Sequence, residues 1–418
     1  MDNIMDVVVV GAGQAGLAVS FLLKRSGVHH VVLERGRIGE SWRSQRWDSF
    51  YLNTPNWGNG LPDSEFYPDA ADAFSSRDQL VSYFERYVHS SDLPVRQHTT
   101  VTALEKDPTG EYNLQIEGDK LRARAVVLAT GGLSRPKVPS VARQLSSEIV
   151  SLSAGTYKNV EALPDGGVVV VGSGQSGCQI AEELLAAGRC VYLCVSRVGR
   201  APRAYRGRDT MAWFRDMGIF DARVDQLEDQ SIQFAAQPQV SGTNGGHTVS
   251  LQLLASGGAT LLGRVLDIDG NILKLGNNLR DCIEFADNKS NTLKANIDAF
   301  INREGIQATA PEPDSGEPAL PNLKGSDRLD TLDLQSAGVG SIIWCTGFDA
   351  DWSWVKIDVF DERGQPRHRN GITESPGLYV IGLPWLSKRK SGILYGVTED
   401  AARIVGHIER HVLVSESV

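Results

Sequence analysis

The feature that most constrains the fold of this chain is an apolar run that ends in a glycine turn close to the N-terminus. Residues 7–10 are four valines, and the sequence GAGQAG follows at residues 11–16. An apolar pattern with helical spacing comes next, and a second apolar run at residues 31–33 ends in Glu34. Strand, glycine turn, helix, strand and acid in this order predict a βαβ unit that binds a dinucleotide.

Each residue of this motif has its own role in that interpretation. Gly11 lets the chain turn off the strand, Gly13 lets the backbone approach a pyrophosphate, and Gly16 lets the helix pack on the sheet. The free N–H groups of the helix start face the phosphates. Glu34 accepts hydrogen bonds from a ribose. A glycine-rich turn in some other α/β domain is the alternative.

A second unit of the same design begins at Gly167. Four valines at residues 168–171 precede GSGQSG at residues 172–177, and the next predicted strand, residues 190–195, ends in Ser196 and Arg197. An arginine at this place suits a 2′-phosphate, so NADPH is expected here, with a solvated charge as the alternative for Arg197. The residues expected to contact this second nucleotide are Gly172, Gly174, Gln175, Ser176, Gly177, Ser196 and Arg197.

Composition and charge exclude several classes of function. The formal net charge of −9 argues against general nucleic-acid binding. No apolar run is long enough to span a membrane, and no signal peptide is recognised, so a cytoplasmic protein without a membrane partner is expected. The five cysteines contain no CxxC pair. We therefore expect reduced thiols, no redox dithiol and no metal site.

The segment after Glu34 is dense in aromatic and polar residues. Trp42, Trp47 and Trp57 lie within sixteen residues, among several Arg and Asn. Such a loop is typical of a cover over a flat aromatic ligand, because Trp gives contact area and Arg and Asn give polar anchors. A packed surface loop is the alternative. A helix is predicted next at residues 78–89.

The later elements are predicted from apolar runs and turns. Strands are expected at residues 101–105, 112–116, 122–128, 341–345 and 377–381, and two of them end in Thr-Gly, at Thr130-Gly131 and Thr346-Gly347. In the middle region we expect a short helix at 251–254, strands at 260–268 and 272–275, and a long helix at 280–302. The basic stretch 199–209 either lines the approach to a phosphorylated cofactor or is a solvated face, and residues 310–319 are expected to form a mobile loop or linker.

Two glycine turns, two strand ends in Thr-Gly and a final helix together resemble the two-dinucleotide-binding flavoproteins. Within that group the chain is similar to the class B flavoprotein monooxygenases of the flavin-containing monooxygenase type, most weakly between residues 205 and 335. The resemblance implies an α/β fold with two Rossmann-like domains, for FAD and for NADPH. The FAD domain comprises residues 1–164 and 336–418, and the NADPH domain, with an insertion, comprises residues 165–335.

The resemblance also implies which residues contact FAD. The segment from Trp42 to Asn53 matches the family's flavin-covering loop, and the Thr-Gly turns match its linkers between domains. A helix that opens at Ser391-Gly392 and runs to about His411 would meet the pyrimidine end of the flavin, with an ordinary helix cap as the alternative. Outside the second unit, the residues expected to bind a cofactor, the linker turns included, are Gly11, Gly13, Gly16, Glu34, Arg35, Ser41, Trp42, Trp47, Thr130, Gly131, Thr346, Gly347, Gly382, Ser391 and Gly392.

One residue is a candidate for a catalytic role. Ser49 and Asn53 match the family's Ser-x-x-x-Asn, whose Asn lies near the flavin and the nicotinamide amide. The family's F-x-G-x-x-x-H-x-x-x-[F/Y/W] signature is largely absent. When the signature is aligned on Tyr157, Ser153 stands in place of its His and Ile149 in place of its Gly. Asn53 is therefore the expected polar group at the reacting face.

The implied reaction is oxygenation of a small molecule. In the family, NADPH reduces the flavin, O₂ adds at C4a, and an amine or thioether attacks the C4a-hydroperoxyflavin, so the flavin carries the difficult step. The expected partners are a small organic substrate and O₂, with a homodimer as a further expectation. An NAD(P)H-dependent flavin oxidase or reductase without oxygen insertion is the alternative, and a non-enzymatic flavin-binding sensor is a third hypothesis.

Overall fold

The first predicted unit supplies two neighbouring strands of the molecule's larger sheet. The computed structural model describes residues 4–66, 69–318, 323, 325 and 328–411. Strand β1 (Met5–Val10), helix α1 (Gln14–Arg25) and strand β2 (His30–Leu33) form the expected βαβ unit, with β1 parallel to β2. The four residues of β2 are all buried, which explains why its sequence is continuously apolar rather than alternating.

Both ends of the chain contribute to this first sheet. Its order is β19-β20-β21-β6-β1-β2-β3, and β21 near the C-terminus pairs in parallel with β6. The predicted strands β4 and β5 pair with each other in antiparallel orientation, and β5 pairs with β6. The bounds are β3 (Val95–Arg96), β4 (Val101–Lys106), β5 (Tyr112–Ile116), β6 (Asp119–Leu128), β19 (His368–Arg369), β20 (Ile372–Thr373) and β21 (Leu378–Val380).

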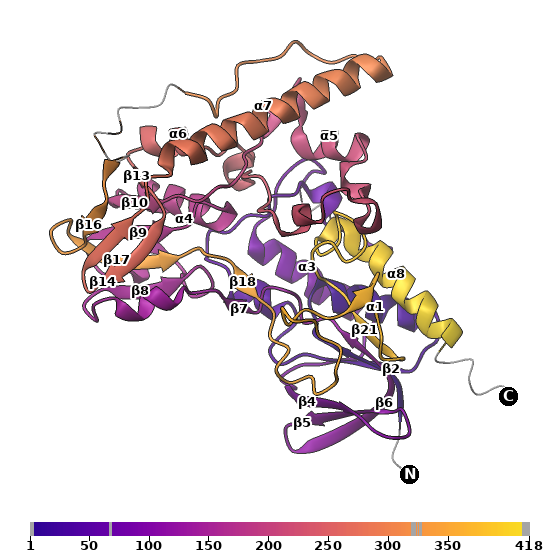
Figure 1. Ribbon diagram of the computed structural model, residues 1–418. Helices are drawn as coiled ribbons and strands as arrows, with labels where there is room; N and C mark the ends of the chain where they lie inside the picture. Colours follow the sequence, from indigo (N-terminus) through magenta and orange to yellow (C-terminus); the bar gives the residue numbers. More distant parts are fainter. Residues whose placement is uncertain (1–3, 67–68, 319–322, 324, 326–327, 412–418) are drawn as a thin grey trace.

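The second glycine turn belongs to a separate sheet of five parallel strands. Its order is β13-β10-β9-β17-β8, with helix α4 (Gln175–Ala186) between β9 and β10 in the sequence. Figure 1 shows this sheet and the first one in two lobes. The bounds are β8 (Val150–Ser153), β9 (Gly167–Val171), β10 (Val191–Cys194), β13 (Thr260–Leu262) and β17 (Val339–Trp344).

The strand pairing moves the expected domain boundaries. Strand β8 precedes residue 165 and strand β17 follows residue 335, yet both lie in the second sheet. The predicted bounds 1–164, 165–335 and 336–418 therefore cut across this sheet at both crossings. The physical reason is that β17 fills the place beside β9, where its backbone groups are hydrogen-bonded on both sides.

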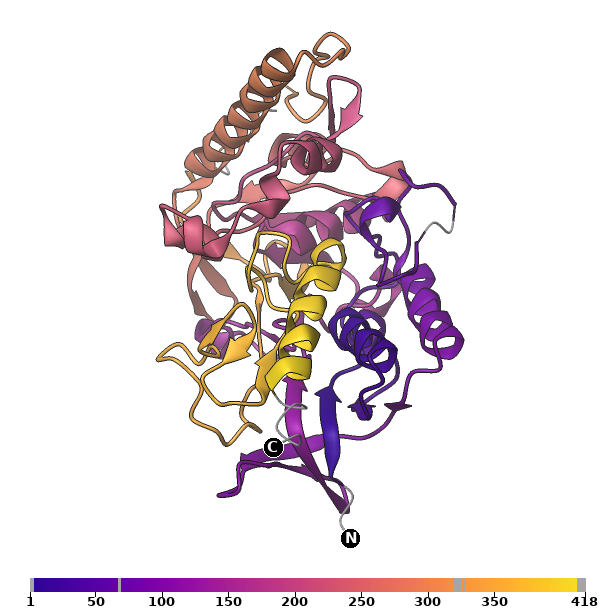
Figure 2. The same cartoon turned by 90° about the vertical axis from the view of Figure 1, so that its right-hand side faces the viewer.

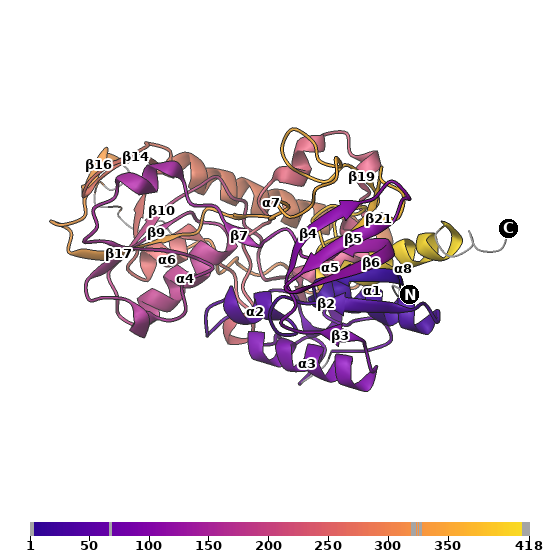
Figure 3. The same ribbon diagram turned by 90° about the horizontal axis from the view of Figure 1, so that it is seen from below.

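The two crossings between the lobes lie side by side. Strand β7 (Arg135–Pro136) follows the first Thr-Gly turn, β18 (Phe348–Asp349) follows the second, and the two pair as an antiparallel ribbon. Figures 1 and 3 show this ribbon between the lobes. The predicted linker positions thus form one double-stranded connection.

The middle region differs from the prediction in two places. The expected strand at residues 260–268 is split: β13 joins the parallel sheet, and β14 (Val265–Asp269) pairs with β15 (Ile272–Leu275) and then β16 (Thr331–Asp333). The described part of the expected mobile loop 310–319 is anchored, because the buried Arg200 guanidinium binds Asp314 at 2.9 Å and Glu317 at 2.5 Å. Ala319 lies outside the described residues.

The remaining helices and short elements complete the fold. The predicted helices at 78–89, 251–254 and 280–302 are α3 (Arg77–Ser90), α6 (Leu251–Ser256) and α7 (Leu279–Glu304). Short strands β11 (Ala204–Tyr205) and β12 (Arg208–Asp209) form a ribbon in the basic stretch. The other helices are α2 (Glu40–Ser44), α5 (Thr210–Asp216) and α8 (Leu394–His411), with 3₁₀ turns at Asn56–Gly58, Ser140–Gln144, Val160–Ala162, Ile219–Asp221, Val224–Gln226, Gln230–Phe234 and Thr243–Gly245.

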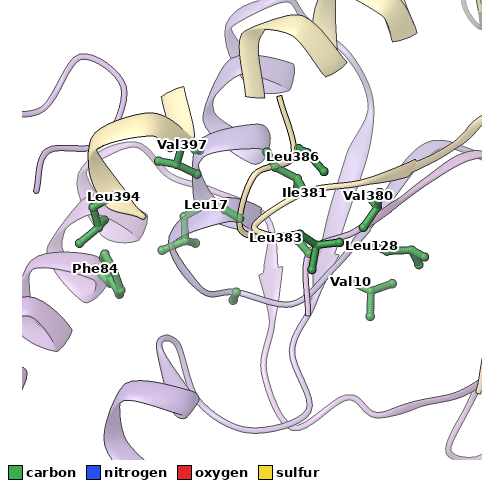
Figure 4. Packing of buried hydrophobic residues seen from close by; sticks show 14 of the residues in the cluster. Val10, Leu17, Phe84, Leu128, Val380, Ile381, Leu383, Leu386, Leu394 and Val397 are labelled. Carbon is green, nitrogen blue, oxygen red and sulfur yellow. The ribbon is translucent and has the colours of Figure 1, made fainter. Parts of the chain in front are cut away.

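The core joins the two ends of the chain. Helix α8 packs beside α1, as Figure 2 shows. In Figure 4, Leu17 of α1 lies close to Val397 of α8, and Val10 and Leu128 come from the paired strands β1 and β6. Burying a leucine of this kind contributes about 2 kcal/mol. Among the described residues no helix is both long and apolar enough to cross a membrane.

Candidate active site

The first glycine of each turn is required by the backbone. Gly11 has φ +109°, and a Cβ there would lie 2.7 Å from the carbonyl oxygen of Ala129. Gly172 has φ +104°, and a Cβ there would lie 2.5 Å from the carbonyl oxygen of Cys345. Both φ values are in the region that favours glycine, and both contacts are too short for a side chain. The two turns therefore have the same local geometry.

The third and second glycines of the turns serve different purposes. A Cβ at Gly16 would lie 1.9 Å from the oxygen of Gly11, and one at Gly177 would lie 1.8 Å from the oxygen of Gly172, so both helices need glycine to pack. Gly13 and Gly174 have φ of −84° and −72°, and nothing described lies within 4 Å of a Cβ at either position. The space in front of these two residues fits a pyrophosphate.

Glu34 closes the first turn as a rigid carboxylate. It is 7% exposed, and its two oxygens accept hydrogen bonds from Ala12 N at 2.7 Å and Gly36 N at 2.9 Å. Each carboxylate oxygen can accept a second hydrogen bond, which suits ribose hydroxyls. Arg35 and Ser41, also expected here, are exposed.

C-terminal residues lie against this first turn, as expected for a domain built from both ends. A Cβ at Gly382 would lie 3.0 Å from that of Ala15, and Gly392 O accepts a hydrogen bond from Gln14 Nε2 at 3.0 Å. The Ser391 hydroxyl is occupied within its own loop, because it accepts hydrogen bonds from the backbone N–H groups of Ser387 and Lys388. Helix α8 itself begins at Leu394, three residues beyond the expected start at Ser391.

The second turn opens into a cavity of about 580 Å³. Two of the residues expected to contact the second nucleotide lie outside the wall of this cavity. Gly177 is buried under the turn, and Arg197 is exposed with its guanidinium 4.3 Å from the ring centre of Phe285. Arg264, which the sequence did not single out, lines the cavity from the end of β13, beside β10. Seven expected residues line it: Gly172, Gly174, Gln175, Ser176, Ser196, Thr346 and Gly347.

The Thr-Gly turns hold the connection between the lobes. The Thr346 hydroxyl donates to the carbonyl oxygen of Lys137, and Lys137 N donates to Gly347 O at 2.9 Å. Gly131 has φ +73° with no described atom within 4 Å of a Cβ, so Thr130-Gly131 turns the chain without a close approach. Only the second turn lines the cavity.

The aromatic loop packs on its own members. Trp42 lies 6.0 Å from Phe50 between ring centres, and Trp47 lies 5.0 Å from Phe50 in an edge-on contact. The Arg46 guanidinium lies 5.3 Å from the Trp42 ring, and burial lowers the pKa of Arg46 to about 10. Cation–π contact and stacking therefore stiffen the loop from within.

Asn53 ties this loop to the second lobe. Its side-chain Oδ1 accepts a hydrogen bond from Gln179 Nε2 of α4 at 2.9 Å, and its backbone oxygen accepts one from Arg203 at 2.8 Å. No hydrogen bond of Asn53 Nδ2 is found within the described part of the chain. The amide can therefore donate to a ligand held between the lobes.

Ser153 and Tyr157, which align with the family signature, form hydrogen bonds within the protein. The Ser153 hydroxyl bonds the hydroxyl of Thr156 at 3.1 Å within its own turn. Tyr157 is fully buried, and its hydroxyl donates to Glu183 at 2.9 Å. Glu183 also accepts from Ser49, so the tyrosine supports the aromatic loop through α4. No pattern in the sequence singled out Glu183, since it lies on an ordinary helical face.

Two known relatives are similar to this chain, one over nearly its whole length and one over less than half of it. An uncharacterized oxidoreductase, CzcO-like, from Geobacillus kaustophilus is 31% identical over 98% of this chain and 100% of its own length. Indole-3-pyruvate monooxygenase YUCCA1 of Oryza sativa is 32% identical over 42% of this chain and 44% of its own length.

Solved structures share the fold over nearly the whole chain. A flavin-containing monooxygenase from Stenotrophomonas maltophilia matches with a TM-score of 0.67 at 19% identity, over 98% of this chain and 99% of its own. The bacillithiol disulfide reductase of Bacillus cereus matches with a TM-score of 0.61 at 15% identity, over the same shares. These matches confirm the predicted α/β fold class. Residues 8–233 match the family model described as pyridine nucleotide-disulphide oxidoreductase, and the chain belongs to this family.

Proposed function

We propose that this protein is an FAD- and NADPH-dependent monooxygenase that inserts one oxygen atom of O₂ into a small organic substrate at nitrogen or sulfur. The observation that carries the proposal is the pair of matched glycine turns, each with open space in front of its second glycine, Gly13 and Gly174. They sit in two sheets joined by one double-stranded connection. In the balanced reaction, NADPH supplies two electrons, and the second oxygen atom of O₂ leaves as water.

The residues of the first turn would hold FAD and those of the second would hold NADPH. Gly13 and the start of α1 would face the pyrophosphate of FAD, and Glu34 would accept from its ribose. Bound FAD would supply the redox and oxygen chemistry. At the second turn, Gln175 and Ser176 meet the NADPH pyrophosphate, while Arg197 and Arg264 are the cations available to its 2′-phosphate.

Asn53 would orient the reacting groups. It stands on the aromatic loop of the first lobe and contacts α4 of the second, which supports a position between the two nucleotides. Its Nδ2, for which the described part of the chain offers no hydrogen-bond partner, would donate toward the cofactors, while Gln179 fixes its Oδ1. The buried rings of Trp47 and Phe50, on the loop that carries Asn53, would exclude water from this side.

The comparisons support an oxygenase within the family. The relative from Oryza sativa and the structural neighbour from Stenotrophomonas maltophilia both carry monooxygenase names. The neighbour from Bacillus cereus is named as a disulfide reductase, which supports a second candidate, an NAD(P)H-dependent reductase or oxidase without oxygen insertion. Ser153 at the position of the family's His favours that second candidate as well.

One experiment separates the two candidates. The FAD-loaded protein is supplied with NADPH and isotopically labelled O₂ and with a panel of alkyl aryl sulfides and tertiary amines. We expect labelled oxygen in a sulfoxide or N-oxide, and less hydrogen peroxide than NADPH consumed. If every substrate leaves peroxide equal to NADPH and no labelled product, the oxidase or reductase is the function.

A further inference from the structure

An exposed phenylalanine stands in the wall of the cavity at the second glycine turn. Phe234 is 70% exposed, more than any other large apolar residue among those that the structure describes. It lines this cavity together with Ala236 and Arg264. Burying a phenyl ring is favourable, so a ring left open at a cavity offers its apolar area to a ligand. None of the NADPH contacts proposed above uses Phe234.

The turn that carries Phe234 does not enclose the ring. Phe234 is the last residue of the 3₁₀ turn Gln230–Phe234, none of whose residues is buried. Ile232, the other apolar residue of the turn, is 43% exposed. The guanidinium of Arg363 lies 5.2 Å from the centre of the phenyl ring. Arg363 belongs to the loop between β18 and β19, so this cation–π contact reaches the ring from the first lobe.

The segment that follows Phe234 is fixed to the second glycine turn. Val240 N donates to Gln175 Oε1 at 3.1 Å, and the Gln239 side chain donates to the backbone oxygen of Ser173. Ser173 and Gln175 belong to the turn that is assigned to the pyrophosphate of NADPH. The ring is therefore held in the cavity by hydrogen bonds to the same turn that the nucleotide would contact.

The place of the ring in the cavity fits the adenine of the nucleotide. In a βαβ unit the pyrophosphate lies at the glycine turn, and the adenosine ribose lies at the end of the second strand. Ser196 follows that strand, β10, and lines the cavity with Val198, Phe234 and Arg264. The 2′-phosphate assigned to Arg264 and the adenine are attached to the same ribose. The base therefore belongs at this end of the cavity.

We propose that Phe234 is the stacking surface for the adenine of NADPH. The phenyl ring packs on one face of the base, and Arg363 supports the ring from the first lobe. Stacking of a base on an aromatic side chain buries apolar area on both rings. The inference rests on the NADPH site of the proposed function and is independent of what happens to O₂.

The test divides NADPH into its two halves. 2′,5′-ADP carries the adenine and the 2′-phosphate, whereas reduced nicotinamide mononucleotide carries the nicotinamide and no adenine. Binding of 2′,5′-ADP to the FAD-loaded protein is measured by titration calorimetry. Reduction of the flavin by the mononucleotide is followed without O₂ by the loss of flavin colour. In Phe234→Ala we expect the affinity for 2′,5′-ADP to fall about tenfold, as for one lost stacked base, and flavin reduction by the mononucleotide to be unchanged.

Two further variants show whether the ring itself is responsible. Phe234→Tyr keeps an aromatic face and should bind 2′,5′-ADP as the wild-type protein does. Ile232→Ala removes an exposed apolar side chain from the same turn but outside the cavity wall, so it is the matched control and should also keep the wild-type affinity. Wild-type affinity in Phe234→Ala overturns the proposal. A loss of the same size in Phe234→Tyr or in Ile232→Ala overturns it as well, because the missing ring would not be the cause.

The same measurements separate this inference from the function on which it rests. If Phe234→Ala slows reduction by the mononucleotide and keeps its affinity for 2′,5′-ADP, the ring serves the nicotinamide and the proposal is overturned. If the wild-type protein does not bind 2′,5′-ADP, the NADPH site fails and the proposal fails with it. If 2′,5′-ADP binds through Phe234 but no substrate is oxygenated, the monooxygenase function fails and the adenine site stands.

Discussion

At the scale of single residues, the glycines of the two turns separate what the fold needs from what a ligand needs. Gly16 and Gly177 are required for packing, because a Cβ there would overlap a backbone oxygen. Gly13 and Gly174 have ordinary backbone angles and open space, so the protein itself would accept alanine at both positions. A bound phosphate, which needs the space in front of them, explains why these two positions are glycine.

We predict that Gly174→Ala folds normally and loses NADPH affinity. The added methyl group occupies the space assigned to the pyrophosphate, so the KM for NADPH should rise at least about tenfold, equivalent to about 1.4 kcal/mol. The Tm and the FAD content should stay at the wild-type level. Gly13→Ala is the matched partner and should lose FAD instead. An unchanged KM in Gly174→Ala would contradict the NADPH site.

We predict that Arg264 and Arg197 set the preference for NADPH. Arg264 lines the cavity at the second turn, and Arg197 follows β10 at the same sheet edge. Replacing either by Gln should lower kcat/KM for NADPH by about tenfold and leave NADH unchanged, because NADH lacks the 2′-phosphate. A wild-type protein that uses NADH as well as NADPH would show that neither arginine has this role.

We predict that Asn53→Ala uncouples the reaction. Without the amide, the group that orients the reacting centre is lost, so hydrogen peroxide released per NADPH should rise several-fold. FAD content should be retained, because Asn53 is not part of the first turn. Asn288→Ala, on the exposed side of α7, is the control. The idea is abandoned if the peroxide yield of Asn53→Ala equals that of the wild-type protein.

At the scale of elements, α4 is the helix that connects the sites. Its first residues meet the cavity at the second turn, Gln179 holds Asn53, and Glu182 and Glu183 line a second cavity of about 390 Å³ between the aromatic loop, α4 and α6. Glu182 also ties the segment at His247 to the helix, since its carboxylate accepts from the imidazole at 2.8 Å. Helix α4 therefore contributes residues to both cavities.

The pair of Glu182 and His247 predicts a pH dependence. The hydrogen bond that the imidazole donates to Glu182 raises the pKa of His247 above its ordinary value of 6.5. A folded-state pKa above the unfolded value stabilises the fold below about pH 6.5, and the contribution is lost as the pH rises through the folded pKa. Glu182→Gln should therefore lower the Tm more at about pH 6 than at about pH 8.5. The loss in the free energy of unfolding should stay below about 1 kcal/mol, because the pair is partly exposed.

An NMR titration of the imidazole checks the same pair directly. The pKa of His247 should fall in Glu182→Gln, because the carboxylate partner is removed. If the pKa is the same in both proteins, the pair does not exist in solution.

At the scale of the whole molecule, the two ends of the chain are joined through α1 and α8. Leu17 is fully buried in the core shown in Figure 4. Leu17→Ala should lower the free energy of unfolding by about 2–5 kcal/mol, because it leaves a cavity where the two helices meet. Denaturant unfolding measures the loss, and Arg25→Ala at the exposed end of α1 should cost less than about 1 kcal/mol. A loss as small as that of the control would show that the two ends are not packed together.

The sequence alone determined the local elements of this protein. Valine runs, GxGxxG turns and Thr-Gly strand ends are short-range patterns, and the strands and helices they predict lie where expected within a few residues. The positions of Gly13 and Gly174 in front of open space could also be predicted, because a glycine turn has the same geometry in any βαβ unit.

The tertiary structure alone decided how distant segments combine. Strand β17 enters the second sheet, Arg200 anchors the loop expected to be mobile, and Arg264 reaches the second turn from a neighbouring strand. The second cavity is made by three segments far apart in the sequence. Such arrangements depend on burial and on long-range hydrogen bonds. No local pattern carries that information, because each residue involved also occurs on ordinary helix faces and loops.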